Sequence, residues 1–171
     1  MWYVIQTSSG KEEKVRQECE KRISKEALSC CALPLYEQKV HYKGQWHMQK
    51  KKLFPGYLFL ISENLPQLRK ELKNIDMVTR LLGVGDEITS LTETEIELIT
   101  RFTDEEEIMK MSEGIIEGDK ITILSGPLKG MESTIKKIDR HKRKAWLKLE
   151  MFNRTQLIEV GLEIIKKVSA E

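Results

Sequence analysis

The chain has 171 residues, a formal net charge of +2 and 40% hydrophobic residues, as in a globular protein of one ordinary domain or two small ones. No apolar run approaches the roughly 20 residues that a membrane helix needs, and the amino terminus lacks the pattern of a secretory signal. We therefore expect a cytoplasmic protein with no membrane partner. The three cysteines form no disulfide framework, and no histidine stands near them at metal-binding spacing, so we expect no metal and no cofactor.

Signals for strands and helices alternate in the first half of the chain. Capping boxes and an Asn cap mark helix starts, because their side chains satisfy free backbone N–H groups. The expected elements are a strand at Trp2–Gln6, a helix after the capping box Ser9–Glu12, an extended Ala32–Tyr42, a hairpin tip at Lys43-Gly44, a central strand at Leu53–Ile61, a helix capped by Asn64, a strand at Val78–Leu82 and a helix after the capping box Thr92–Glu95. This order predicts an α+β fold, with one antiparallel sheet and helices largely on one face.

The second half has a different character. An acidic segment at 104–113 has little periodicity and is interpreted as a linker. Turn signals, one of them Gly161, then separate several short strand-like segments. These segments are Lys120–Leu124, Thr134–Ile138, Ala145–Leu149, Gln156–Val160 and Ile164–Val168. Five short strands in so little chain predict a small closed or nearly closed barrel.

Nothing in the sequence indicates catalysis. The three histidines, His41, His47 and His141, lie near predicted turns and have no paired Ser or Cys nucleophile. The stretch Gly126–Gly130 lacks the Gly-Lys-Ser/Thr ending of a phosphate-binding loop, which favours a turn between strands. We therefore expect a protein that is not an enzyme.

Aromatic residues flank the mouth of the predicted central strand. Pro55 and Gly56 stand between Phe54 and Tyr57, directly after Lys50–Lys52 and Leu53. Tyr3 lies on one face of the first strand by its period of two, and Ile5 shares that face. If the two strands are neighbours, the aromatic residues form a pocket at the sheet edge. Ordinary core packing is the alternative, because aromatic residues are usually buried.

Positive charge is concentrated in one loop of the second half. Met1 to Glu105 holds 16 basic and 16 acidic residues, whereas Leu128–Arg154 holds 9 basic and 3 acidic, a balance of +6. Such a cluster is the electrostatic footprint of a nucleic-acid partner, and a merely solvated loop is the alternative. Trp146 follows the cluster, and the sequence leaves open whether it belongs to the core or stacks on an unpaired base.

Several motifs resemble those of one family. Trp2–Gln6, Gly10-Lys11-Glu12, Lys52–Tyr57 and Leu91–Ile96 resemble the N-terminal (NGN) domain of NusG/Spt5 transcription elongation factors. Gly118–Ile121, Ser125-Gly126-Pro127 and Met151–Thr155 resemble the family's KOW domain. The resemblance covers nearly the whole chain. It implies an NGN domain at 1–104, a linker at 105–113 and a KOW domain at 114–171, the last an SH3-like five-stranded barrel.

The resemblance also implies partners. The N-terminal domain is expected to bind the clamp helices of RNA polymerase through Tyr3, Ile5, Phe54, Pro55 and Tyr57. The KOW domain is expected to bind RNA, and we predict a monomer. The candidate RNA-binding residues are Lys129, Lys136, Lys137, Arg140, His141, Lys142, Arg143, Lys144 and Arg154.

The departures from the family pattern favour a specialised member. Leu128 occupies a position where housekeeping members carry an aromatic that helps bind ribosomal protein S10 or the terminator Rho, and Ser133 replaces a usual glycine. Together with the rich basic loop, this makes the chain most similar to LoaP, a group tied to antitermination through a leader RNA hairpin. The alternatives are a general NusG-type elongation factor whose KOW domain binds S10 or Rho, and a ribosome-associated RNA-binding protein.

Overall fold

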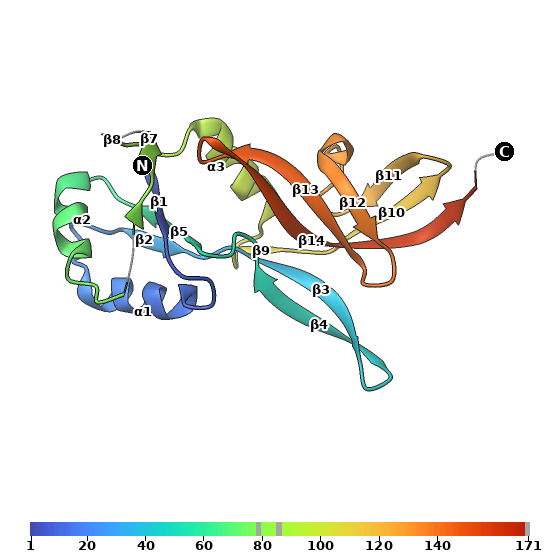
Figure 1. Cartoon of the computed structure of the whole chain (residues 1–171), viewed down its shortest axis with the longest axis horizontal. Helices are drawn as coiled ribbons and strands as arrows, with labels where there is room; N and C mark the ends of the chain where they lie inside the picture. The colour runs from blue at the N-terminus through green and yellow to red at the C-terminus, as the bar shows by residue number, and fades with distance from the viewer. Residues whose placement is uncertain (78–79, 85–86, 170–171) are drawn as a thin grey trace. The chain divides into compact units, whose positions relative to one another are not determined.

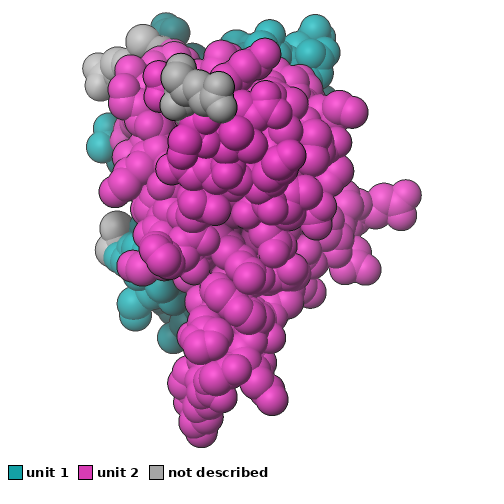
Figure 2. Space-filling model, turned by 90° about the vertical axis from the view of Figure 1, so that its right-hand side faces the viewer, with its two compact units in different colours: residues 1–33, 54–97 teal, residues 34–53, 98–171 magenta. Residues whose placement is uncertain are grey.

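A computed structural model describes residues 1–77, 80–84 and 87–169. Its secondary structure is mixed α+β, as predicted, with helices α1 (Glu12–Arg22), α2 (Leu65–Leu72) and α3 (Glu93–Phe102) (Figure 1). The prediction of one antiparallel sheet in the first half is wrong, because its strands belong to separate sheets. The chain divides into two compact units, coloured separately in Figure 2: Met1–Leu33 with Phe54–Glu97, and Pro34–Leu53 with Leu98–Glu171. No helix in the described ranges is long and apolar enough to span a membrane.

A four-stranded antiparallel sheet forms the centre of the first unit. Its order is β2 (Cys30–Ala32), β5 (Tyr57–Ile61), β1 (Trp2–Gln6) and β6 (Arg80–Leu81). The prediction of a central strand is confirmed for β5, since β1 and β2 pair with its two edges. A two-stranded ribbon, β7 (Gly83–Val84) and β8 (Glu87–Ile88), follows β6. Of the strand predicted at Val78–Leu82, the first two residues lie outside the described ranges.

Two of the three predicted helix caps are confirmed. The backbone N–H of Gln67 donates to the Asn64 side chain at 3.2 Å. Thr92 and Glu95 exchange side-chain-to-backbone hydrogen bonds of 3.2 Å, which is a complete capping box. The capping box predicted at Ser9–Glu12 is wrong, because α1 begins at Glu12 itself and the Glu12 side chain accepts from the N–H of Gly10 at 2.8 Å.

A long β-hairpin opens the second unit. It consists of β3 (Leu35–Tyr42) and β4 (Gln45–Lys52), with the tip at Lys43-Gly44 as predicted. Both tip residues have positive φ, 50° and 75°, the pattern of a type I′ turn. The segment interpreted as a linker contains β9 (Ile108–Met109), which pairs in parallel with the start of β3.

The C-terminal sheet, β10–β14, has the order β11-β10-β14-β13-β12. Its strands are β10 (Ser112–Glu117), β11 (Lys120–Ser125), β12 (Ile135–Asp139), β13 (Lys144–Met151) and β14 (Arg154–Val168), with a short 3-10 helix, η1 (Glu132–Thr134), before β12. Five strands were predicted, but two details were wrong. The predicted linker includes the start of β10 and no strand is predicted over the rest of it, and the last two predicted strands are one continuous strand, β14.

Gly161 was the reason for the second error. It was interpreted as a turn, but it lies inside β14, paired with Lys144. A side chain here would place its Cβ 2.1 Å from the backbone oxygen of Glu37 in β3. Glycine is therefore required because the two backbones approach closely, which is a common reason for glycine inside a strand.

Candidate nucleic-acid interface and aromatic turn

The aromatic turn, Phe54–Tyr57, leads the chain into β5. The N–H of Tyr57 donates to the Phe54 oxygen at 3.1 Å, and Gly56 has a φ of +85°. Proline followed by glycine with positive φ is typical of a type II turn. The N–H of Thr7 fixes the turn against the end of β1 by donating to the Gly56 oxygen at 2.8 Å.

Glu12 holds this turn from the other side and was not among the predicted site residues. Its side chain is 1% exposed, and its Oε1 accepts from the N–H groups of both Gly10 and Gly56, at 2.8 and 3.1 Å. A buried carboxylate must be compensated by such donors. The signal in the sequence is Gly10-Lys11-Glu12 itself, which was interpreted as part of a capping box and as a family motif.

The register of the sheet separates the predicted polymerase-binding residues. Directly paired residues of antiparallel strands share a face. Tyr3 and Ile5 pair with Leu60 and Leu58, whereas Tyr57 pairs with Gln6 and therefore lies on the opposite face. Tyr3 and Ile5 are 5% and 0% exposed and belong to the core.

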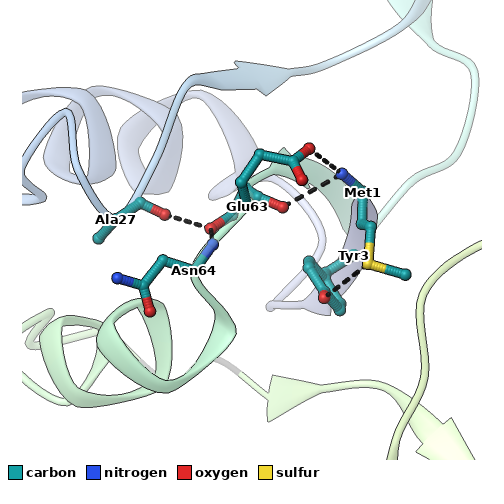
Figure 3. Close-up of polar contacts among 6 residues, drawn as sticks. Met1, Tyr3, Ala27, Glu63 and Asn64 are labelled. Atoms are coloured by element: carbon teal, nitrogen blue, oxygen red, sulfur yellow. Dashed lines mark hydrogen bonds and ion pairs between the residues drawn. The ribbon is translucent and has the colours of Figure 1, made fainter.

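Polar contacts fix the start of β1, next to Tyr3. The Tyr3 hydroxyl donates to the Met1 sulfur at 3.6 Å (Figure 3). The amino group of Met1 bonds the Glu63 carboxylate at 2.7 Å and the Ser62 oxygen at 3.1 Å. These contacts give Tyr3 a structural role.

The Tyr57 face of the sheet carries the other aromatic residues. Phe54 packs edge-on against Phe59, with ring centroids 5.5 Å apart, and Trp2 lies 6.2 Å from the same ring. Phe54 is buried, Pro55 is exposed, and Trp2 and Tyr57 are half-buried. The surface available to a partner therefore consists of Pro55 and Tyr57 above a buried Phe54, with Trp2 as an aromatic that the predicted set omitted.

The basic loop, Asp139–Lys144, joins β12 to β13. The Asp139 carboxylate accepts from the N–H of Lys142 at 3.0 Å, and this hydrogen bond is the main reason why the pKa of Asp139 is lowered. Arg143 closes the loop with a positive φ of 52°. The loop is thus a fixed turn, with the side chains of Arg140, His141 and Lys142 exposed.

A β-bulge extends the positive surface along β12. The pairing between β12 and β13 shifts between Ile135 and Lys137, so Lys136 and Lys137 are both exposed although they are consecutive in a strand. Bulges often re-aim side chains in this way. Residues Lys137–His141 line a cavity of about 520 Å³. Lys137 and Arg140 thus place positive charge at a hollow large enough for part of a nucleotide chain.

Two cations of the loop have partners in the same unit. The Arg143 guanidinium lies 3.7 Å from the centre of the Trp46 ring and 3.3 Å from the Glu163 carboxylate. Lys144 forms an ion pair with Glu159 at 3.3 Å, and its side chain is 14% exposed. The Lys142 backbone oxygen also accepts from the Gln38 side chain at 2.9 Å.

Arg154 is not brought to the basic loop. It begins β14 opposite Met151, at the far end of β13 from Lys144. Seven residue steps along β13 separate the two ends, roughly 24 Å at about 3.4 Å per step. Lys129 lies in the turn after β11, where its backbone oxygen accepts from Arg101 at 2.9 Å. The predicted RNA-binding set therefore consists of a continuous group, Lys136–Lys144, and these two outlying residues.

The family model described as "Transcription termination factor nusG" matches residues 1–100, more than half of the chain. The chain belongs to the NusG family. Its relatives include the transcription termination/antitermination protein NusG of Rickettsia bellii, 30% identical over 171 residues that cover 97% of this chain and 89% of the relative. NusG of Helicobacter pylori is 24% identical and covers 98% of both chains.

A solved NusG structure has the same fold. The structure entitled "Domain interaction in Thermotoga maritima NusG" has a TM-score of 0.57 and 22% identity, and the match covers 95% of this chain and 93% of that one. Because NusG proteins are transcription factors, membership of the family confirms the expectation that the chain is not an enzyme.

Proposed function

We propose that the chain is a transcription antitermination factor of the NusG family that binds RNA polymerase through its N-terminal domain and a leader RNA hairpin through its C-terminal domain. The match to the family along residues 1–100 carries the first part of this proposal. Exposed basic residues between Lys136 and Lys142 carry the second, and Lys137, Arg140 and His141 among them line one cavity. In this account residues 1–104 are the NGN domain, 105–113 the linker and 114–171 a KOW domain of SH3-like barrel type.

The aromatic turn is the proposed contact with the clamp helices of the polymerase. Pro55 is exposed and Tyr57 is half-buried in this turn, and the buried Phe54 supports them from below. Tyr3 and Ile5 support the same sheet from its opposite face. Such anchored aromatic residues are the usual centres of protein interfaces.

The basic loop and the bulged lysines are the proposed contact with RNA. Lys136, Lys137, Arg140 and His141 are exposed and stand on one hairpin, β12–β13. The lysine and arginine cations among them gain affinity for phosphates by releasing counterions. Lys142, Arg143, Lys144, Lys129 and Arg154 extend the set, with Arg143 and Lys144 already engaged by carboxylates.

The burial of Leu128 favours an RNA partner over a protein partner for the C-terminal domain. Its side chain is 0% exposed, and its N–H donates to the buried Ser112 hydroxyl at 3.0 Å. A side chain so enclosed offers no surface at the position where housekeeping relatives bind ribosomal protein S10 or Rho. This observation supports the LoaP-like specialisation.

Binding of the full chain to leader RNA tests the proposal. The probe is the RNA hairpin from the leader of the operon beside this gene, and an unrelated hairpin of equal length is the control. We expect tighter binding to the leader hairpin, with a log–log salt slope of about −0.7 to −0.9 for each phosphate contact. In parallel, the purified polymerase should bind the full chain, and Tyr57→Ala should weaken that complex.

Two results contradict the proposal in different parts. Equal and weak binding to both hairpins removes leader recognition and leaves a general elongation factor. A stable complex with S10 or Rho, formed in the absence of RNA, would show that the C-terminal domain binds a protein partner instead of RNA.

A further inference from the structure

Trp146 lies on the outward face of β13. The strand alternates, with Ala145, Leu147, Leu149 and Met151 buried and with Lys144, Trp146, Lys148 and Glu150 on the other face. Trp146 is half-buried, so part of its ring is open to solvent. This placement answers the question that the sequence left open, because Trp146 does not point into the core of the C-terminal sheet.

Two lysines flank the ring of Trp146, and they are held differently. The Lys144 ammonium lies 4.7 Å from the ring centre, and its ion pair with Glu159 fixes it there. The Lys137 ammonium lies 4.9 Å from the ring centre, but Lys137 is exposed and has no ion pair among the described residues. Lys137 also lines the cavity beside the basic loop.

We infer that Trp146 is the stacking surface for one unpaired base of the bound RNA, an inference that rests on the proposed RNA-binding function. The base takes the place of the Lys137 ammonium on the ring. Lys137 then turns toward the adjacent phosphate, near Arg140 at the cavity. Lys148 follows Trp146 by two residues on the same face and meets the phosphate on the other side of the base.

Physical chemistry favours a base over the lysine on this ring. An exposed cation–π contact is weak, because the ammonium gives up part of its hydration. A base stacks with a larger area and without that loss, and aromatic residues between cations are the usual surface for single strands. Stacking on Trp146 also favours single-stranded over double-stranded RNA, since a base in a duplex is already stacked on its neighbours.

Binding of the full chain to an oligoadenylate and to a blunt RNA duplex of equal length tests the inference. Trp146→Leu keeps an apolar side chain but removes the aromatic face. We expect it to weaken oligoadenylate binding by about 5-fold to 100-fold and to leave duplex binding unchanged. Trp146→Phe should stay close to the wild type. Leu124→Ala, which changes an exposed apolar residue of β11, is the matched control and should change neither affinity.

A second measurement remains valid if Trp146→Leu fails to fold. In a chain with Trp2→Phe and Trp46→Phe, Trp146 is the only tryptophan. Stacking predicts that oligoadenylate quenches its fluorescence and that the duplex does not. Unchanged oligoadenylate affinity in a folded Trp146→Leu chain, or equal quenching by both RNAs, overturns the inference while RNA binding itself stands. If the wild-type chain binds neither RNA, the inference is overturned, whereas the proposed RNA-binding function fails only if the leader hairpin is not bound either.

Discussion

Arg140 and Arg143 stand in the same loop, but their guanidinium groups have different surroundings. Arg140 is exposed at the cavity, whereas Arg143 is stacked on Trp46 and paired with Glu163. A cation that already has a carboxylate and a ring as partners must give them up before it reaches a phosphate. The basic residues of this loop look equivalent in the sequence, but they therefore differ in how readily they reach a phosphate.

We predict that Arg140→Ala weakens RNA binding of the full chain more than Arg143→Ala does. The first variant should lower the affinity at low salt and reduce the salt slope by about one unit, since it removes one phosphate contact. The second should leave the slope nearly unchanged. Salt titrations of both variants measure this, and equal slopes for the two would show that Arg143 leaves Glu163 when RNA binds.

The three cysteines also differ in their surroundings, since two are buried and one is exposed. Burial raises the pKa of Cys19 to about 11, with the nearby Glu20 and Glu18 adding to the shift, and burial raises the pKa of Cys31 further. Cys30, its neighbour in β2, is exposed. Since thiolates are the reactive form, the two buried thiols stay unreactive near neutral pH.

We expect one thiol per folded chain to react with an alkylating reagent at pH 8, and three after unfolding. The buried Cys19 thiol also links stability to pH. Burial raises the pKa of Cys19 from the usual thiol value of about 9.0 to about 11, so the folded state keeps this proton longer than the unfolded chain. The contribution to stability is therefore complete below pH 9 and is lost as the pH rises through about 11. Rapid reaction of a second thiol in the folded chain would contradict this assignment.

At the scale of elements, Glu12 joins the start of α1 to the turn before β5. Glu12→Ala leaves the N–H groups of Gly10 and Gly56 without their charged acceptor. We predict a loss of about 3 kcal/mol in the free energy of unfolding, since hydrogen bonds to charged groups contribute about 1.5–3 kcal/mol each. Denaturant unfolding measures it.

Two variants control for other effects of charge removal in α1. Glu12→Gln keeps one oxygen as an acceptor and should lose less than Glu12→Ala. Glu13→Ala changes an exposed residue of the same helix turn and should stay within about 0.5 kcal/mol of the wild type. If Glu12→Ala is no worse than Glu13→Ala, the carboxylate does not hold the turn.

Elements with a local chemical signal could be predicted from the sequence, and those set by distant contacts could not. Thr92–Glu95, Asn64 and the tip Lys43-Gly44 carry their own hydrogen-bond or φ requirements, and all three were confirmed. Gly161 looked like a turn because its cause is a backbone distant in the sequence, that of β3. Glu12 looked like a cap because its second donor, Gly56, comes from another part of the sequence.

At the scale of the whole molecule, the chain combines a neutral first half with a cationic hairpin in the second. The residue types of the candidate sites were visible in the sequence, since aromatic and basic clusters are compositional signals. The sequence did not show which members of each cluster lie together in the fold and which lie apart. The register that separates Tyr3 from Tyr57 and the strand length that separates Arg154 from the basic loop both depend on pairing. In the proposed account, recruitment by RNA and retention by the polymerase are two functions of one chain.

Transcription by purified polymerase across a terminator tests the central claim most directly. Two templates are compared, one with the leader hairpin upstream of the terminator and one with an unrelated hairpin in its place. The account predicts that the full chain raises readthrough only on the first template, and that either Tyr57→Ala or Arg140→Ala reduces the effect. Equal readthrough on both templates, or readthrough that survives both substitutions together, would contradict it.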